Sequence, residues 1–272
     1  MGRMWRAMFL LLCGGLAAGP AFAQDGEDVP FITTPDHVTL AMLRLAGVRP
    51  RDHVLDLGSG DGRIVITAAR HFGAGGHGVE IVPELVARSR ANAQKAGVAA
   101  RASFAVQDLF ETDLAPASVI TMYLLPEFNL KLRPKLLLLK PGTRIVSHDW
   151  DMGDWVSDRS VTVDVPDKVV GREKLSRLHL WVVPAAVQGL WCAKDAALAL
   201  TQTYQFVQGR LSIGRSSVAV NGRLDGARLS LQAAALQMKA LVAGDRLRVH
   251  TATFTPRGLA REFARASGDT CP

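Results

Sequence analysis

The stretch VLDLGSGDGRIV, residues 54–65, joins an apolar strand to three closely spaced glycines. Glycines after a buried strand let a ligand lie against bare backbone. A dinucleotide-binding loop has the spacing G-x-G-x-x-G, whereas Gly58, Gly60 and Gly62 lie one residue too close together. A nucleotide P-loop needs Gly-Lys-Ser/Thr, and none follows. Neither phosphate-binding motif therefore fits this loop.

Two carboxylates also argue against a phosphate ligand. Asp56 stands two residues before the first glycine, at the end of the strand, and Asp61 lies inside the loop beside Ser59 and Gly60. Carboxylates repel a pyrophosphate and attract a cation. The loop is therefore expected to hold a cationic group, such as an α-amino group.

Acids also end the next two expected strands. Glu80 ends the strand expected at 77–81, where a carboxylate accepts both hydroxyls of a ribose. Asp108 ends the strand expected at 102–107, where its side chain accepts an adenine amino group and backbone amides nearby, at Leu109, serve the ring nitrogens. Amino acid, ribose and adenine at successive strand ends describe S-adenosylmethionine. Singly, each residue is equally an ordinary turn glycine or solvated acid, and only the joint spacing favours the cofactor.

Strands and helices alternate from Thr34 to Trp150. The expected strands are 53–58, 77–81, 102–107, 118–123 and 143–148. This alternation predicts an α/β fold with a doubly wound, mostly parallel sheet. Pro134 is expected to interrupt the helix-rich stretch after the fourth strand. Two further strands, 160–165 and 178–183, predict an antiparallel hairpin at one edge.

The sequence pattern changes from about residue 189. Apolar and polar residues alternate, and Asn221-Gly222 and Asp225-Gly226 are hairpin signals. A small antiparallel β domain is therefore expected over 189–272, with PRGLAREFARA (256–266) interpreted as a terminal helix. Two cysteines, Cys192 and Cys271, lie in this domain, and the sequence leaves open whether they form a disulfide or stay as two thiols.

The N-terminus predicts export. Two arginines, a short apolar run and an A-x-A ending are typical of a signal peptide, residues 1–23, cleaved after Ala23. Its removal takes the net charge from +7 to +5, because it contains Arg3 and Arg6 and no acid. A periplasmic protein is expected, with an uncleaved membrane anchor as the alternative. The small positive excess favours an acidic partner or an anionic membrane surface, and its dispersion gives nucleic-acid binding little support.

The motifs DLGSGDGRIV, GVEI, QDLF and YLLPE resemble those of class I, seven-stranded SAM-dependent methyltransferases. The similarity is to the group that contains the ATP synthase c-subunit lysine methyltransferases and their bacterial relatives. VPFITTPDHV (29–38) resembles the segment before the glycine loop in that group. The resemblance covers about residues 29–184. It implies strand order 3-2-1-4-5-7-6, with strand 7 antiparallel.

The resemblance also assigns residues to the cofactor. It implies a methyltransferase domain over 24–188, before the β domain. The implied S-adenosylmethionine site comprises Thr34, Asp56, Gly58, Ser59, Gly60, Asp61, Gly62, Glu80, Asp108 and Leu109. The eukaryotic members carry a membrane-targeting segment and lack the β-rich extension, so the resemblance does not transfer a substrate.

The methyl acceptor is expected beyond the fourth and fifth strands. Methyl transfer is an in-line displacement that needs a positioned acceptor with a free lone pair. Tyr123 begins YLLPE, where related amino-methylating enzymes carry an oxygen that receives the target N–H groups, and His148 and Asp149 are the candidate bases. Trp150 and Trp155 either form an apolar channel or cap the core. The seven histidines lack metal-ligand spacing, so no metal is expected.

These observations favour a SAM-dependent methyltransferase, with protein lysine as one acceptor and a small molecule or lipid as the alternative. A third hypothesis is a non-catalytic exported binding protein on a methyltransferase fold, because a periplasm is not known to hold S-adenosylmethionine. A dehydrogenase is disfavoured by the glycine spacing.

Overall fold

The structure, a computed structural model, describes residues 32–169, 173–234, 236–253 and 259–271. The signal peptide expected at residues 1–23 lies outside these ranges. Within them, no helix has the length and apolar character needed to cross a membrane.

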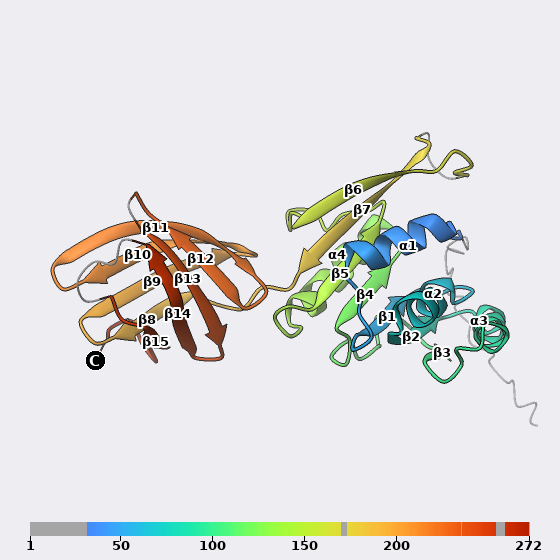
Figure 1. The fold of residues 1–272 in the computed structure, drawn as a ribbon, viewed down its shortest axis with the longest axis horizontal. Coiled ribbons are helices and arrows are strands. Elements are labelled where there is room, and N and C mark those ends of the chain that lie inside the picture. The colour runs from blue at the N-terminus through green and yellow to red at the C-terminus, as the bar shows by residue number, and fades with distance from the viewer. Residues whose placement is uncertain (1–31, 170–172, 235, 254–258, 272) are drawn as a thin grey trace, which may run out of the picture. The chain divides into compact units, whose positions relative to one another are not determined.

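Seven strands form one mixed sheet in the order β3-β2-β1-β4-β5-β7-β6 (Figure 1). Strands β1 to β5 run parallel, and β7 is antiparallel to both β5 and β6. The strands are β1 (His53–Leu57), β2 (Gly75–Glu80), β3 (Ala102–Val106), β4 (Val119–Met122), β5 (Arg144–His148), β6 (Arg159–Asp164) and β7 (Leu175–Val182). The prediction of a doubly wound, mostly parallel sheet is therefore confirmed.

Helices cover both faces of this sheet. They are α1 (Asp36–Leu45), α2 (Arg63–Phe72), α3 (Pro83–Lys95) and α4 (Pro126–Leu137). Successive strand side chains point to opposite faces. Val54 of β1 accordingly packs in a cluster with residues of α1 and α2, whereas Leu55 and Leu57 pack with residues of α4. Both faces of the central strands are buried, which leaves only their ends for a ligand.

Helix α4 continues through Pro134, so the predicted interruption was wrong. Proline removes one helical hydrogen bond and crowds the carbonyl four residues earlier. Leu132 and Leu136, on either side of it, are completely buried. Their burial stabilises the helix by more than the proline destabilises it.

Eight further strands close into an antiparallel barrel in the order β10-β11-β12-β13-β14-β15-β8-β9 (Figure 1). They are β8 (Gly189–Ala193), β9 (Ala196–Thr203), β10 (Phe206–Ile213), β11 (Ser216–Asp225), β12 (Arg228–Gln232), β13 (Gln237–Ala243), β14 (Arg246–Thr253) and β15 (Glu262–Arg265). The prediction of an antiparallel β structure after the α/β part is confirmed. A closed barrel has no free sheet edge.

The predicted terminal helix was wrong where the structure describes it. Glu262–Arg265 forms β15, which pairs with both β14 and β8 and completes the barrel. Phe263 is completely buried in the barrel core. Residues 254–258 lie outside the described residues.

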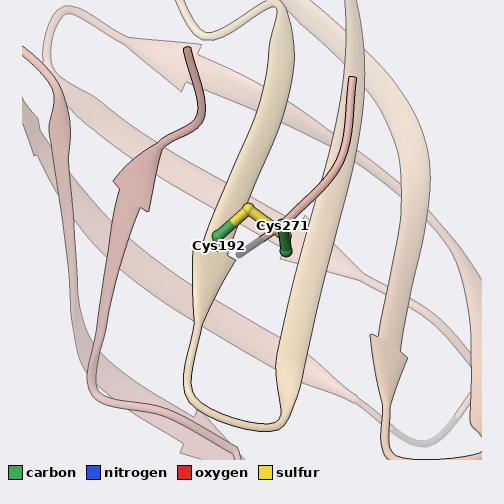
Figure 2. Close-up of a disulfide and its surroundings, with 2 residues drawn as sticks. All are labelled: Cys192 and Cys271. Carbon is green, nitrogen blue, oxygen red and sulfur yellow. A yellow bond between two sulfur atoms is a disulfide. The ribbon is translucent and has the colours of Figure 1, made fainter. Parts of the chain in front are cut away.

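A bond joins Cys192 of β8 to Cys271 near the C-terminus (Figure 2). The sulfur atoms lie 1.98 Å apart and the Cα atoms 5.5 Å apart, across a sequence separation of 79 residues. The bridge links the strand that starts the barrel to the segment that follows its last strand.

Candidate active site

The loop between β1 and α2 contains three glycines in the left-handed region of backbone conformation. Gly58, Gly60 and Gly62 have φ angles of 74°, 52° and 81°, which residues with a Cβ rarely adopt. The amides of Gly58 and Ser59 both donate to the Val79 carbonyl of β2, at 3.0 and 2.9 Å. These bonds fix bare backbone at the carboxyl ends of β1 and β2.

Glu80, the last residue of β2, holds the same loop from the other side. Its Oε2 accepts the Gly60 amide at 3.0 Å, and its Oε1 accepts the amides of Ile81 and Val82 at 2.9 and 3.1 Å. About four lone-pair sites are available on a carboxylate, so one strong acceptor position remains for a hydroxyl group. A contact to both hydroxyls of a ribose requires one of these amides to move.

Asp56 lies beneath the loop rather than on its surface. Its side chain is buried, and Oδ1 accepts the Thr121 hydroxyl of β4 at 2.7 Å. Burial is the main cause that raises the pKa of Asp56 to about 8; the Thr121 bond opposes this rise, and the nearby charges of Glu80 and Asp61 contribute to it. The unliganded protein therefore keeps this acid largely protonated at neutral pH, and a nearby cation would favour the carboxylate.

The raised pKa of Asp56 predicts a pH-dependent stability. An acid whose folded pKa lies above its ordinary value of 3.8 contributes full stability below that value, and loses it as pH rises through about 8. We expect the melting temperature of the unliganded protein to fall between pH 5 and pH 8, and to fall less in Asp56→Asn. Thermal melts of both proteins at the two pH values measure this, and parallel falls would contradict it.

Arg63, which the sequence reasoning missed, neutralises Asp61. Its Nε and one terminal nitrogen donate to the two Asp61 oxygens at 2.9 and 2.6 Å, and its other terminal nitrogen donates to the Thr34 carbonyl at 2.8 Å. The pKa of Asp61 is lowered, since the Arg63 bonds outweigh the effect of burial. The carboxylate predicted to meet an amino group is thus already paired, and Arg63 ties the glycine loop to the segment before α1. The sequence signal that could have indicated this ion pair is the two-residue spacing of Asp61 and Arg63 in DGR.

The expected adenine side of the site is more open. Asp108 is exposed, and its Oδ1 accepts the Phe110 amide at 2.7 Å. Leu109 packs against the hydrophobic cluster that Leu55 and Leu57 form with residues of α4. Ser59 is buried, and its hydroxyl has no hydrogen-bond partner among the described residues. The roles assigned to these residues stay predictions.

A second cluster lies at the carboxyl ends of β4 and β5. The Tyr123 hydroxyl donates to Asp149 Oδ2 at 3.2 Å, and the Tyr123 and His148 rings stack with centroids 3.9 Å apart. Asp149 adopts a left-handed φ of 65°. Lys168, which sequence reasoning did not single out, places its ammonium 2.7 Å from the same Oδ2. The structure thus brings together the three residues that the sequence predicted for the acceptor side.

His148 is enclosed by its neighbours. Its Nδ1 lies 3.2 Å from the Thr34 hydroxyl and its Nε2 lies 2.7 Å from the Ser176 hydroxyl, with the side chain buried. Burial lowers the pKa of His148 to about 4, so the ring is neutral at pH 7. Burial likewise raises the pKa of Tyr123 to about 12, with Asp149 adding to the effect. Of the two base candidates, Asp149 is therefore the more accessible, and His148 orients its neighbours.

Asn129 of α4, also missed by sequence reasoning, anchors the loop after β5. Its buried amide nitrogen lies 3.2 and 3.1 Å from the carbonyls of Trp150 and Asp151. Trp155 is buried in the core and donates its indole N–H to Gln205 Oε1 at 3.1 Å, whereas Trp150 is 41% exposed. Of the two tryptophans, Trp155 caps the core and Trp150 stays at the rim. The described residues include no metal-binding group of three or more His, Cys, Asp or Glu side chains.

Known proteins are similar to this chain in sequence. Residues 56–159 match the model of the ANTKMT methyltransferase domain. A protein-lysine N-methyltransferase of Saccharolobus islandicus is 45% identical over 138 residues, which are 50% of this chain and 86% of that protein. The ATP synthase c-subunit lysine N-methyltransferase of Mus musculus is 34% identical over 133 residues, which are 48% of this chain and 53% of that protein.

A solved structure shares both fold and sequence. The crystal structure of an RNA methyltransferase from Salinibacter ruber, with S-adenosyl-L-homocysteine, is 49% identical. It covers 57% of this chain and 96% of its own, with a TM-score of 0.52.

The seven-stranded sheet, the glycine loop and these relatives define a SAM-dependent methyltransferase, with S-adenosyl-L-methionine as its cofactor. More narrowly, the chain belongs to the same family as the Saccharolobus islandicus methyltransferase, and its residues 56–159 match the ANTKMT methyltransferase domain.

Proposed function

We propose that this chain is a protein-lysine N-methyltransferase. One observation carries the proposal: Asp149 already receives a lysine ammonium, that of Lys168, at 2.7 Å, under the Tyr123 hydroxyl. The side chains of Lys168 and Asp149 are only 13% and 15% exposed. A half-enclosed carboxylate of this kind suits an amine acceptor better than a hydroxyl or carbon acceptor. The names of the archaeal and mouse relatives support the same acceptor class.

The chemistry requires a neutral amine in line with the methyl group. The cofactor supplies an electrophilic methyl group when bound. The incoming ammonium takes the place of Lys168 on Asp149 and Tyr123 orients it, and the proton leaves to solvent before the nitrogen lone pair reacts. His148, held between Thr34 and Ser176, keeps the Tyr123 ring in place by stacking.

The acceptor class is tested by supplying methyl-labelled S-adenosylmethionine to the purified protein together with a mixture of envelope proteins, RNA and small molecules. The proposal expects label in protein, recovered as methyl-lysine after hydrolysis. Label confined to RNA, the acceptor named for the Salinibacter relative, or to small molecules or lipids would contradict it.

Substitution of Asp149 by asparagine tests the role of its charge. We expect kcat/KM for a protein acceptor to fall about 100-fold, because a hydrogen bond to a charged group is worth roughly 1.5–3 kcal/mol. Asp151→Asn in the same loop is the matched control, since the exposed Asp151 side chain accepts the Gly153 amide at 3.0 Å and lies outside the Tyr123–Asp149–Lys168 contacts. Equal losses in both variants would show that the loop, rather than the Asp149 charge, matters.

We also propose that the protein is exported and that Cys192 and Cys271 are oxidised in the cell. The signal-like residues 1–23 support export, and the adjacent sulfurs of the two cysteines support a bridge. Intact mass of the protein purified from its source tests both proposals. We expect a mature chain that begins at Gln24 and gains two mass units on reduction.

Reduction should also destabilise the barrel. A bridge across 79 residues restricts the unfolded chain and contributes about 2–4 kcal/mol. We expect a reductant to lower the unfolding midpoint of the wild type and to leave that of Cys192→Ser unchanged. An identical midpoint for oxidised and reduced wild type would contradict this.

A further inference from the structure

The positive charge of the protein is concentrated in the barrel segment. Residues 189–272 contain eleven Lys and Arg against five Asp and Glu, a net charge of +6. Residues 24–188 contain nineteen against twenty, a net charge of −1. The barrel therefore favours an anionic partner in a way that the methyltransferase part does not.

A row of side-chain amides crosses four neighbouring strands on the outside of the barrel. Gln208 of β10 pairs with Asn221 of β11, Asn221 with Gln232 of β12, and Gln232 with Gln237 of β13. All four side chains are exposed, and Gln232 Nε2 donates to Asn221 Oδ1 at 3.0 Å. Amides donate and accept hydrogen bonds at once, so this row suits a ligand that bears many hydroxyl groups.

The next row along the same strands is aromatic and cationic. Phe206 pairs with Arg223, Arg223 with Ser230, and Ser230 with Lys239. Phe206 is 43% exposed, and the Arg223 guanidinium lies 5.4 Å from its ring centroid. Arg223 also pairs with Asp158 at 2.5 Å, which holds its guanidinium in place.

Both rows line one groove of about 580 Å³. Gly222 lies in the groove, where a Cβ would come 2.0 Å from the Ser230 carbonyl. The close approach of the β12 backbone to β11 at this point therefore requires glycine. A second groove of about 570 Å³ adjoins the first and shares Arg223, Ser230 and Lys239 with it.

We propose that this groove binds an anionic polysaccharide. The amide row pairs with sugar hydroxyls, the open face of Phe206 packs against the apolar face of a pyranose ring, and Lys239 with Arg223 receives the carboxylate. Each sugar hydroxyl donates and accepts at once, as each amide of the row does, whereas the carboxylates of an acidic peptide only accept; a neutral glycan would not use the net charge of +6. The barrel is then the part of the chain that attaches the enzyme to the polysaccharide.

The test measures binding of polygalacturonate to the full-length protein, with dextran, polyglutamate and a single-stranded oligonucleotide as comparisons. We expect polygalacturonate to bind more tightly than the other three polymers, and more weakly as salt is raised. Phe206→Ala and Lys239→Ala should each weaken binding about 5- to 10-fold. Lys194→Ala, which removes the same charge at the turn between β8 and β9, should leave it unchanged.

Equal binding of dextran, polyglutamate or the oligonucleotide would overturn the proposal, as would a failure of polygalacturonate to bind or an equal effect of Lys194→Ala. Methyl transfer to a protein acceptor is measured separately on the same variants and should be unaffected. The two proposals therefore fail independently.

Discussion

Glu80→Gln should bind S-adenosylhomocysteine about 10- to 100-fold more weakly than the wild type. The Glu80 carboxylate accepts the Gly60, Ile81 and Val82 amides, and we expect its remaining acceptor position to receive a ribose hydroxyl. The substitution replaces one carboxylate oxygen, an acceptor, with an NH2 group, a donor. This donor then faces either a backbone N–H or the ribose. Loss of a charge-assisted bond costs roughly 1.5–3 kcal/mol, which corresponds to this range of affinities.

Titration calorimetry of both proteins measures the effect. Glu84→Gln is the matched control, because Glu84 is an exposed acid in the first turn of α3. Its affinity should equal that of the wild type. If Glu80→Gln keeps wild-type affinity, the cofactor ribose does not depend on this carboxylate, and the proposed cofactor geometry is wrong.

Gly62→Ala should destabilise the methyltransferase part far more than Gly47→Ala. Both glycines are left-handed, with φ of 81° and 61°, so each substitution costs roughly 1 kcal/mol in backbone strain. A Cβ on Gly62 would lie 2.7 Å from both the Phe104 ring and Ser89 Cβ, whereas one on Gly47 meets nothing within 4 Å. The clash adds about 1–3 kcal/mol, for a total of about 2–4 kcal/mol.

Far-UV circular dichroism during urea unfolding separates the two variants. All four described helices lie between residues 36 and 137, so the helical signal reports on this part of the chain. We expect a much lower midpoint for Gly62→Ala and a small shift for Gly47→Ala. Equal shifts would mean that Phe104 and Ser89 move aside without cost and that the loop packs less tightly than described.

The sequence predicts the sheet and the position of the glycine loop, because both depend on local signals. Buried strands, glycine spacing and acids at strand ends are short-range patterns, and they located Glu80 and the three glycines. The sequence also located Tyr123, His148 and Asp149 at strand ends. It did not predict that His148 is enclosed by Thr34 and Ser176, which lie 114 and 28 residues away.

Long-range pairing explains the errors as well. Leu259 and Phe263 have helical spacing, yet Phe263 fills the barrel core as part of β15, because β14 and β8 supply hydrogen-bond partners on both sides. Pro134 is a strong local signal against a helix, and the burial of Leu132 and Leu136 overrides it. Lys168 reaches Asp149 from the segment after β6, and no local motif indicates this contact.

Calorimetric titration of the wild-type protein with S-adenosylhomocysteine tests the central claim most directly. A cofactor site at the carboxyl ends of β1 and β2 predicts saturable heat with one site per chain at micromolar ligand. The absence of heat at millimolar ligand would contradict the account and favour a non-catalytic protein on a methyltransferase fold.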